Sequence, residues 1–170
     1  FSETGVFVLM LEYLWRVDQP DTFFGTAGGR SMGLMIPALL GGKIARPDTP
    51  MMGIGGDGSA LMRLGELSMI GTAGIAAPMV IVNDSALGTI KSRQKSRGLP
   101  EYGLDLSTTD FSLVARAAGL EGVRVDTPDD FEDALKMAFK ADRATVIDAR
   151  VDGEAYRNSF GATTTGETHG

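Results

Sequence analysis

Two short apolar runs, each leading into an acidic residue, constrain the fold of this chain more than any other feature. Met51–Ile54 leads into Asp57, and Met79–Val82 leads into Asp84. Between them, Ser59–Gly74 predicts a helix with a glycine-rich exit. In a strand–helix–strand unit of a parallel sheet, the chain returns to the edge that it left. We therefore expect the two carboxylates at the carboxyl edge of a sheet, where open α/β sheets bind ligands.

Two neighbouring carboxylates favour a bound cation, because at about 4 Å they repel by roughly 4 kcal/mol at an effective dielectric near 20. Hard oxygen donors of this kind suit Mg²⁺ or Ca²⁺. Gly56 and Gly58 flank Asp57 and allow backbone N–H groups to approach an anion closely. A metal-bridged diphosphate fits both features.

The spacing of these residues carries a family resemblance. Gly56-Asp57-Gly58-Ser59 is followed, 27 positions after its Asp (84 − 57), by the second residue of the pair Asn83-Asp84. This arrangement resembles the thiamine diphosphate motif, in which GDG is followed at a distance by NN. Further segments are similar to acetolactate synthase and benzoylformate decarboxylase: Gly28–Gly33, Ala45–Asp48, Glu66-Leu67 and Leu87-Gly88. The likeness runs from about Gly5 to Val151.

The resemblance implies the C-terminal, diphosphate-binding domain of such an enzyme. Its fold would be α/β and doubly wound, with a mostly parallel sheet and helices on both faces, and the alternation of strand and helix patterns agrees. We expect residues 1–151 to form this domain. Residues 152–170 lack a periodic pattern and are expected to be a mobile tail. Since the chain begins at Phe1 and not at Met, we interpret it as part of a longer protein.

The remaining elements follow from apolar periodicity and end signals. Asp110 and Thr127 are expected to be helix N-caps, and Pro128 suits a first helical position. The predicted helices are Gly5–Val17, Gly33–Ala45, Gly88–Arg97, Phe111–Ala118 and Pro128–Lys140. The predicted further strands are Thr22–Phe24, Val123–Val125 and Ala144–Ala149.

The resemblance also implies a set of metal ligands: Asp57, Asp84 and the main-chain carbonyl of Ala86. Asp84 stands where the family usually has Asn. In comparison with Asn, Asp keeps the oxygen donor but adds a negative charge. This departure should tighten Mg²⁺ binding and weaken the direct attraction for diphosphate. Asn83 is expected to fix the loop by hydrogen bonds and not to bind the metal. Ser59 and its neighbour Gly58 would donate to phosphate oxygens.

Met32 matches the bulky apolar residue that, in the family, supports the bent form of the cofactor. The main-chain carbonyl of Arg30 would accept a hydrogen bond from the 4′-amino group, while the Arg30 side chain is placed equally well toward the substrate carboxylate or in solvent. The whole cofactor-binding set implied by the resemblance is Arg30, Ser31, Met32, Gly56, Asp57, Gly58, Ser59, Asp84, Ala86, Leu87 and Gly88. The loop that carries the implied ligands Asp84 and Ala86 is called the metal loop. The basic residues after it, from Lys91 to Arg97, are interpreted as a solvated helix face.

The implied function is to bind the Mg²⁺–diphosphate end of thiamine diphosphate within a 2-oxo acid decarboxylase or carboligase. No catalytic residue is expected in this chain, because in the family the activating glutamate comes from a separate pyrimidine-binding domain or subunit. A homo-oligomer, dimer or tetramer, is expected.

Three alternatives stay open. The chain could be the small subunit of a two-chain decarboxylase of the sulfopyruvate type. It could instead be a non-catalytic thiamine diphosphate-binding domain. A magnesium-dependent phosphatase ranks last, because Asp57-Gly58-Ser59 lacks the second Asp of a DxD pattern.

Composition narrows the partners and the location. A net charge of −6 and a pI near 4.8 disfavour binding to nucleic acid or to an anionic membrane. The chain has no cysteine, which excludes disulfides and thiolate metal sites and is in keeping with a cytoplasmic protein. The apolar run Val6–Leu11 is far shorter than the ~20 residues that span a bilayer.

Overall fold

The computed structural model describes residues 1–26, 29 and 31–155. Its centre is one four-stranded sheet in the order β1-β2-β4-β3, and every pair of neighbouring strands is parallel. The strands are β1 (Gly53–Gly56), β2 (Pro78–Asn83), β3 (Glu121–Val125) and β4 (Thr145–Arg150). The helices are α1 (Val6–Leu14), α2 (Met35–Ala45), α3 (Asp57–Leu61), α4 (Glu66–Thr72), α5 (Gly88–Ser96), α6 (Phe111–Ala117) and α7 (Pro128–Ala138).

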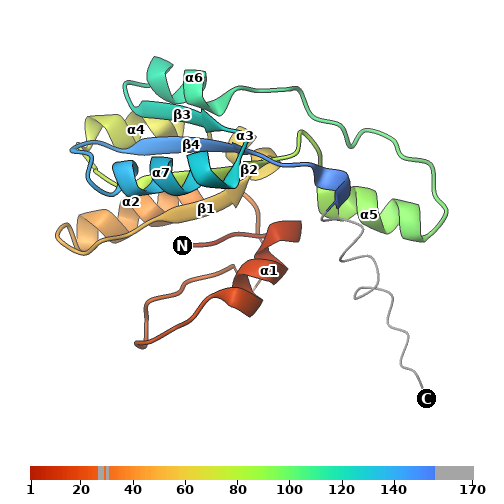
Figure 1. Cartoon of the computed structure of the whole chain (residues 1–170), viewed down its shortest axis with the longest axis horizontal. Helices are drawn as coiled ribbons and strands as arrows, with labels where there is room; N and C mark the ends of the chain where they lie inside the picture. The colour runs from red at the N-terminus through yellow and green to blue at the C-terminus, as the bar shows by residue number, and fades with distance from the viewer. Residues whose placement is uncertain (27–28, 30, 156–170) are drawn as a thin grey trace.

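Helices cover both faces of this sheet (Figure 1). Apolar side chains of α2, α4 and α6 pack in one cluster with Met79, Ile81 and Val146 of the strands. On the opposite face, Ala134 and Ala138 of α7 pack in a second cluster with Val80 and Ile147. These strand residues alternate along the chain with Met79, Ile81 and Val146, so their side chains point to the other side of the sheet. The expected α/β class with a parallel sheet and helices on both faces is confirmed.

β2 is the most deeply buried strand and ends at the candidate site. Met79, Val80 and Ile81 are almost completely buried, because helices cover both faces of the sheet at this strand. Burial of each such side chain contributes roughly 1.5–3 kcal/mol. A strand anchored in this way gives the residues after Asn83 a fixed starting point.

Both predicted helix caps are present. The Asp110 carboxylate accepts a hydrogen bond from Leu113 N at 3.1 Å, at the start of α6. The Thr127 hydroxyl accepts one from Asp130 N at 3.2 Å, at the start of α7. These bonds satisfy N–H groups that the first turn of a helix leaves without an intrahelical partner.

Two predicted elements are wrong in detail. The helix expected over Ser59–Gly74 is two helices, α3 and α4, because the chain between them turns through short bonds such as Arg63 N to Ala60 O at 3.0 Å. Thr22–Phe24 is not a strand. The N-terminal residues take the edge position beside β1 instead, where Ser2 pairs with Ile54 and donates to Phe24 O at 2.7 Å.

The end of the chain only partly falls within the description. Residues 153–155 form a short helical turn after β4, and the expected tail beyond Ala155 lies outside the described residues. Within the described part of the chain, no helix is long and apolar enough to cross a membrane.

Candidate functional site

Asp57 and Asp84 follow neighbouring strands and reach the same cavity. β1 and β2 pair in parallel with Gly56 opposite Val82, so the residues that follow each strand emerge at one edge of the sheet. Both aspartates line a cavity of about 320 Å³ at this edge. This is the arrangement expected from the strand pattern.

The Asp57 carboxyl is held in surroundings that oppose its ionisation. Burial raises the pKa of Asp57 from its usual 3.8 to about 6, and the charge of Asp84 acts in the same direction. Backbone N–H groups, first that of Gly58, lower the pKa but do not cancel the effect. Gly58 N donates to Asp57 Oδ1 at 2.7 Å. Among the described residues, the buried Asp57 Oδ2 has no hydrogen-bond partner, so this oxygen is suited to a cation.

The loop after β2 is held by its own polar groups. Asn83 Oδ1 accepts hydrogen bonds from Ser85 N at 3.2 Å and Ser85 Oγ at 3.4 Å. Ser85 has a φ of 54°, a left-handed conformation that costs a non-glycine residue about 1 kcal/mol or more. Ala86 N donates to Asp84 Oδ1 at 3.2 Å, which ties the aspartate to the loop. Asn83 thus fixes this loop, as the sequence suggested.

A second segment supports the loop from outside. Leu87 N donates to Leu104 O, and Leu106 N donates to Ser85 O, each at 2.8 Å. In this antiparallel pairing the N–H and C=O of Ala86 point away from the supporting segment. Ala86 also lines the cavity, and its carbonyl is not used by the supporting segment.

Gly58 allows three apolar side chains to close around the start of α3. A Cβ at this position would lie 2.8 Å from Leu87 Cδ2, 3.4 Å from Leu106 Cδ1 and 3.5 Å from Met32 Cε. Only glycine fits here without moving Leu87. The motif glycine therefore brings the backbone close to the apolar wall of the cavity.

Most of the predicted cofactor-binding residues lie around this one cavity. Those that line it are Met32, Gly56, Asp57, Gly58, Ser59, Asp84, Ala86, Leu87 and Gly88. Ser31 is exposed and is not among the lining residues. Arg30 lies outside the described residues.

The sequence analysis missed two walls of the cavity. The first is the start of α1 and the residues before it: Thr4, Gly5, Val6, Phe7 and Leu9. The second is α5, which contributes Thr89, Ile90, Ser92 and Arg93. The signal for this second wall is that α5 begins directly after the loop that carries Asp84 and Ala86, so one helical face, such as Thr89 and Arg93 at i and i+4, returns over the cavity.

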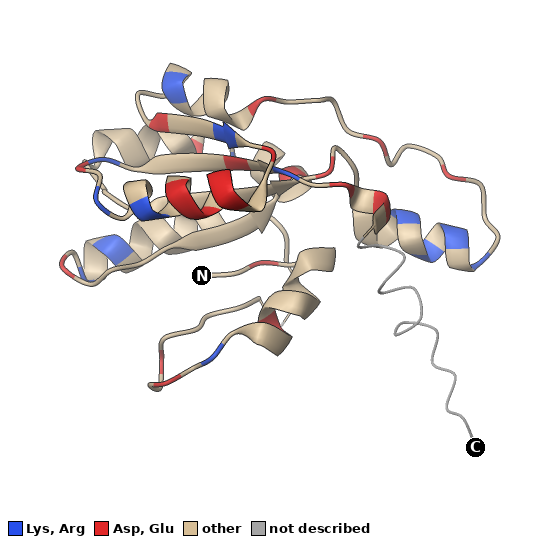
Figure 2. Ribbon diagram, viewed as in Figure 1, with Lys and Arg blue, Asp and Glu red and all other residues tan. Residues whose placement is uncertain are grey.

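The basic residues of α5 are marked in Figure 2, and two of them, Arg93 and Lys95, are exposed, as a solvated helix face requires. Lys91 Nζ pairs with Asp105 at 2.8 Å and with Glu101 at 3.3 Å, which ties α5 to the following loop. Arg93 is the only Lys or Arg among the described residues that line the cavity. It adds a positive charge to the lining of the cavity that the two aspartates also line.

The oxygen donors of Asp57, Asp84 and Ala86 suit a hard divalent cation whose remaining coordination positions are filled by a bound ligand. No cluster of three or more His, Cys, Asp or Glu side chains able to hold a metal occurs in the described part of the chain. The two carboxylates and the Ala86 carbonyl offer oxygen donors only, which suits Mg²⁺ when an anionic ligand supplies further oxygens. Apolar side chains on the other walls, among them Phe7, Met32 and Leu87, suit an apolar ring.

Comparisons with known proteins agree with this arrangement. Residues 3–149 match the model of the thiamine pyrophosphate enzyme, C-terminal TPP binding domain. The acetolactate synthase large subunit of Haemophilus influenzae is 30% identical over 89% of this chain and 27% of its own length. Benzoylformate decarboxylase of Pseudomonas aeruginosa is 34% identical over 74% of this chain and 24% of its own length.

Solved structures give the same result. The thiamine diphosphate-dependent 4-hydroxybenzoylformate decarboxylase of Rhodococcus jostii RHA1 superposes with a TM-score of 0.70 and 32% identity over 76% of this chain and 24% of that one. Benzoylformate decarboxylase from Polynucleobacter necessarius has the same fold, with a TM-score of 0.80 and 24% identity over 89% of this chain and 29% of its own. The chain thus spans about a quarter of the length of these proteins.

Proposed function

Because this chain belongs to the thiamine pyrophosphate enzyme family, as its C-terminal TPP-binding domain, we propose that its cavity holds the Mg²⁺–diphosphate end of thiamine diphosphate. The observation that carries this proposal is the meeting of Asp57 and Asp84 in one cavity at the carboxyl edge of the sheet. The raised pKa of Asp57 and its buried, unpartnered Oδ2 support a cation between them.

Each wall of the cavity has a role in this proposal. The carboxylates of Asp57 and Asp84 and the carbonyl of Ala86 bind the metal, while Gly58 and Ser59 lie where they can contact the phosphates. Met32 and Leu87 pack against the ring system, with Gly56 and Gly88 allowing the backbone to come close. By resemblance alone, Arg30 and Ser31 belong to the same binding set.

When bound, thiamine diphosphate supplies the nucleophilic carbon and the electron sink that decarboxylation of a 2-oxo acid requires. The residues of this chain would hold the charged end of the cofactor. Asp57 holds its proton more tightly than a free carboxyl does, so it binds a metal only after losing that proton.

The full protein, in this proposal, is a 2-oxo acid decarboxylase or carboligase. Both kinds of chemistry occur among the relatives, as the names acetolactate synthase and benzoylformate decarboxylase state. Since the chain spans about a quarter of those proteins, the activating glutamate and the pyrimidine-binding surface come from another domain or subunit. Assay of the full protein with pyruvate and with benzoylformate, followed by product analysis, distinguishes aldehyde release from carboligation.

Calorimetry on the full protein tests cofactor binding. Thiamine diphosphate is titrated with Mg²⁺ present and again after the divalent ions have been removed with a chelator. We expect binding only with Mg²⁺, and a loss of at least ~100-fold in Asp57→Ala and Asp84→Ala, since each lacks one metal ligand. Asp126→Ala, an exposed acidic residue on another loop, is the matched control and should bind normally. Equally strong binding without any divalent ion would refute the proposal.

A further inference from the structure

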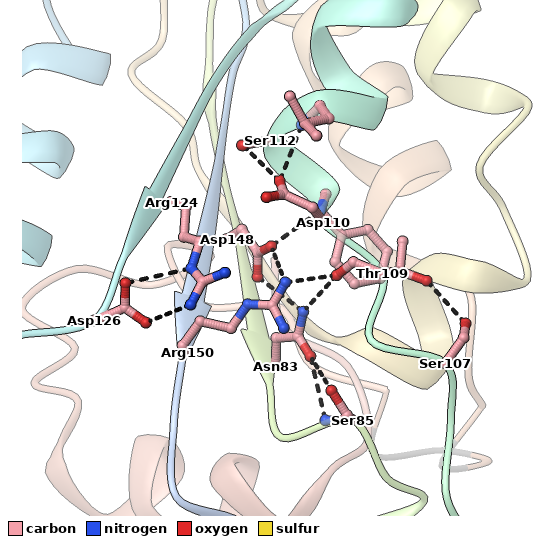
Figure 3. Close-up of polar contacts among 12 residues, drawn as sticks. Asn83, Ser85, Ser107, Thr109, Asp110, Ser112, Arg124, Asp126, Asp148 and Arg150 are labelled. Carbon is pink, nitrogen blue, oxygen red and sulfur yellow. Dashed lines mark hydrogen bonds and ion pairs between the residues drawn. The ribbon is translucent and has the colours of Figure 1, made fainter.

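A fully buried carboxylate lies behind the metal loop without belonging to the cavity. Asp148 sits on β4, next to Ile81 of β2 in the strand register, and its exposed fraction is 0%. Figure 3 shows its two oxygens surrounded by donors from three elements. Oδ1 accepts from Asn83 Nδ2 at 2.9 Å, and Oδ2 accepts from Phe111 N and Arg150 Nη2, each at 3.0 Å.

Asp148 determines which way the Asn83 amide faces. An ionised carboxylate can only accept hydrogen bonds, so the group that Asn83 turns toward it must be the NH₂ group. The same NH₂ donates to Thr109 O at 3.2 Å, and both of its hydrogens are then used. The amide oxygen of Asn83 is left facing the loop, where Ser85 N and Ser85 Oγ donate to it.

The conformation of the metal loop depends on the orientation of this amide. Ser85 holds a positive φ of 54° while its N–H is bonded to Asn83 Oδ1. A reversed amide would present NH₂ to Ser85 N, a donor facing a donor, and the bond that holds this conformation would be lost. Asp84 and Ala86 flank Ser85, so the directions of the Asp84 carboxylate and the Ala86 carbonyl depend on it.

We propose that Asp148 is a positioning residue that acts through Asn83 to hold the Asp84–Ala86 loop in its cavity-lining conformation. It touches neither the cavity nor the proposed ligands. The consequence for metal binding rests on the proposed function. The effect on the loop itself does not, and the two are measured separately.

A purely structural role for Asp148 predicts a different result. Its bonds to Phe111 N and Arg150 tie α6 to β4, so any substitution also loosens the whole domain. If that were all, the loop after β2 would respond no more than other segments near β4. Positioning requires a local effect on Asn83–Gly88 that exceeds the global one.

Hydrogen–deuterium exchange with mass spectrometry on the full protein measures this local effect without any ligand. In Asp148→Asn, we expect amide exchange in Asn83–Gly88 to be at least ~10-fold faster, relative to the core of β2, because Asn83 can now reverse its amide. Asn83→Ala should give the same local increase, and the double variant should add nothing further. Asp126→Asn is the control. It removes an exposed carboxylate that pairs with Arg124 at 3.0 Å on the neighbouring strand, and should leave the loop unchanged.

The outcomes are decisive even if Asp148→Asn does not fold. Unchanged loop exchange in Asn83→Ala overturns the proposal, because Asp148 is argued to act only through that amide. Additive effects of the two substitutions also overturn it. Calorimetry with Mg²⁺ and thiamine diphosphate should show a ~10–100-fold loss of affinity in Asp148→Asn, the range for residues that orient metal ligands. If the unmodified protein binds no cofactor, the proposed function fails, while the exchange data still decide the positioning role.

Discussion

Asp57 is only 5% exposed, and its pKa is raised to about 6, mainly by burial and also by the charge of Asp84. A folded-state pKa above the unfolded value near 3.8 means that the folded protein binds this proton more tightly than the unfolded chain does. The resulting stabilisation is fully present below the unfolded pKa and is lost as the pH rises through about 6. The buried Asp57 carboxylate therefore has an energetic cost in the folded protein at neutral pH.

We predict that Asp57→Asn removes this pH dependence. Between pH 4 and pH 7 the free energy of unfolding of the metal-free protein should fall by up to about 3 kcal/mol more than that of the variant. Urea unfolding of both proteins across this range measures the difference. Saturating Mg²⁺ and thiamine diphosphate should reverse the order at pH 7, since only the unmodified protein binds them. Parallel pH profiles for the two proteins would contradict the assignment.

Gly58→Ala tests the close approach at the start of α3. The added Cβ would lie 2.8 Å from Leu87 Cδ2, so Leu87 must move its flexible end. We expect a modest loss of stability, about 1 kcal/mol, and a ~10-fold loss of thiamine diphosphate affinity, because Leu87 lines the cavity. Calorimetry and urea unfolding measure the two effects.

Gly65→Ala is the matched control for Gly58→Ala. Gly65 has a φ of −61°, and its added Cβ would meet nothing within 4 Å. This substitution should stabilise the protein by about 0.5–1 kcal/mol without changing cofactor affinity. Unchanged affinity in Gly58→Ala would show that Leu87 is not part of the binding wall.

At the scale of elements, the sequence predicted the features that depend on residues close together in the chain. The apolar runs gave β2 within one residue at each end, and the caps at Asp110 and Thr127 came from residue type alone. The break between α3 and α4 was missed because the pattern of Ser59–Gly74 can continue as one helix, whereas the structure has turn bonds such as Arg63 N to Ala60 O between the two helices.

The same division applies to the candidate site. Asp57 and Asp84 could be placed because each directly follows a strand. The α1 wall and Asp148 could not, since their positions depend on tertiary packing between segments far apart in the chain. Asp148 is 65 residues from Asn83, and nothing in the local sequence marks it as a partner of the loop.

Glu3 joins the N-terminal segment to α2 and offers an element-scale prediction. Its side chain is 1% exposed, and Oε2 accepts from Leu34 N at 2.7 Å and Met35 N at 3.1 Å. In Glu3→Ala these N–H groups lose their acceptor and a small cavity forms, so we expect a loss of about 3 kcal/mol. Cofactor affinity should fall as well, because the turn that carries Met32 precedes α2. Urea unfolding and calorimetry measure the two quantities.

Thr127→Ala provides the comparison for Glu3→Ala. It removes one cap from α7, on the opposite face of the sheet and away from the cavity residues. The expected loss is about 1 kcal/mol, with unchanged cofactor affinity. A stability loss in Glu3→Ala no larger than in Thr127→Ala would show that Glu3 does not anchor α2.

At the scale of the whole molecule, α1 presents apolar side chains that the described residues of this chain do not cover. α1 stands apart from the helices that cover the sheet (Figure 1), and its last turn exposes Tyr13 by 93% and Leu14 by 73%. Trp15 and Val17, just after the helix, are also exposed. Four exposed apolar residues within five positions of the sequence are more typical of an interface than a single exposed apolar residue, which is ordinary.

We expect these four residues to be buried when the full protein assembles, since the proposed function places a second protein surface over the exposed end of the cofactor. Leu14→Glu should therefore convert an oligomeric full-length protein to smaller species, as measured by light scattering at micromolar concentration, and reduce its turnover. Met137→Glu is the matched control, because Met137 is 72% exposed on α7, away from the cavity. That variant should keep both the assembly and the activity of the unmodified protein. If Leu14→Glu retained its full size and turnover, α1 would not be part of the interface; an active monomer of the unmodified protein would exclude the shared site altogether.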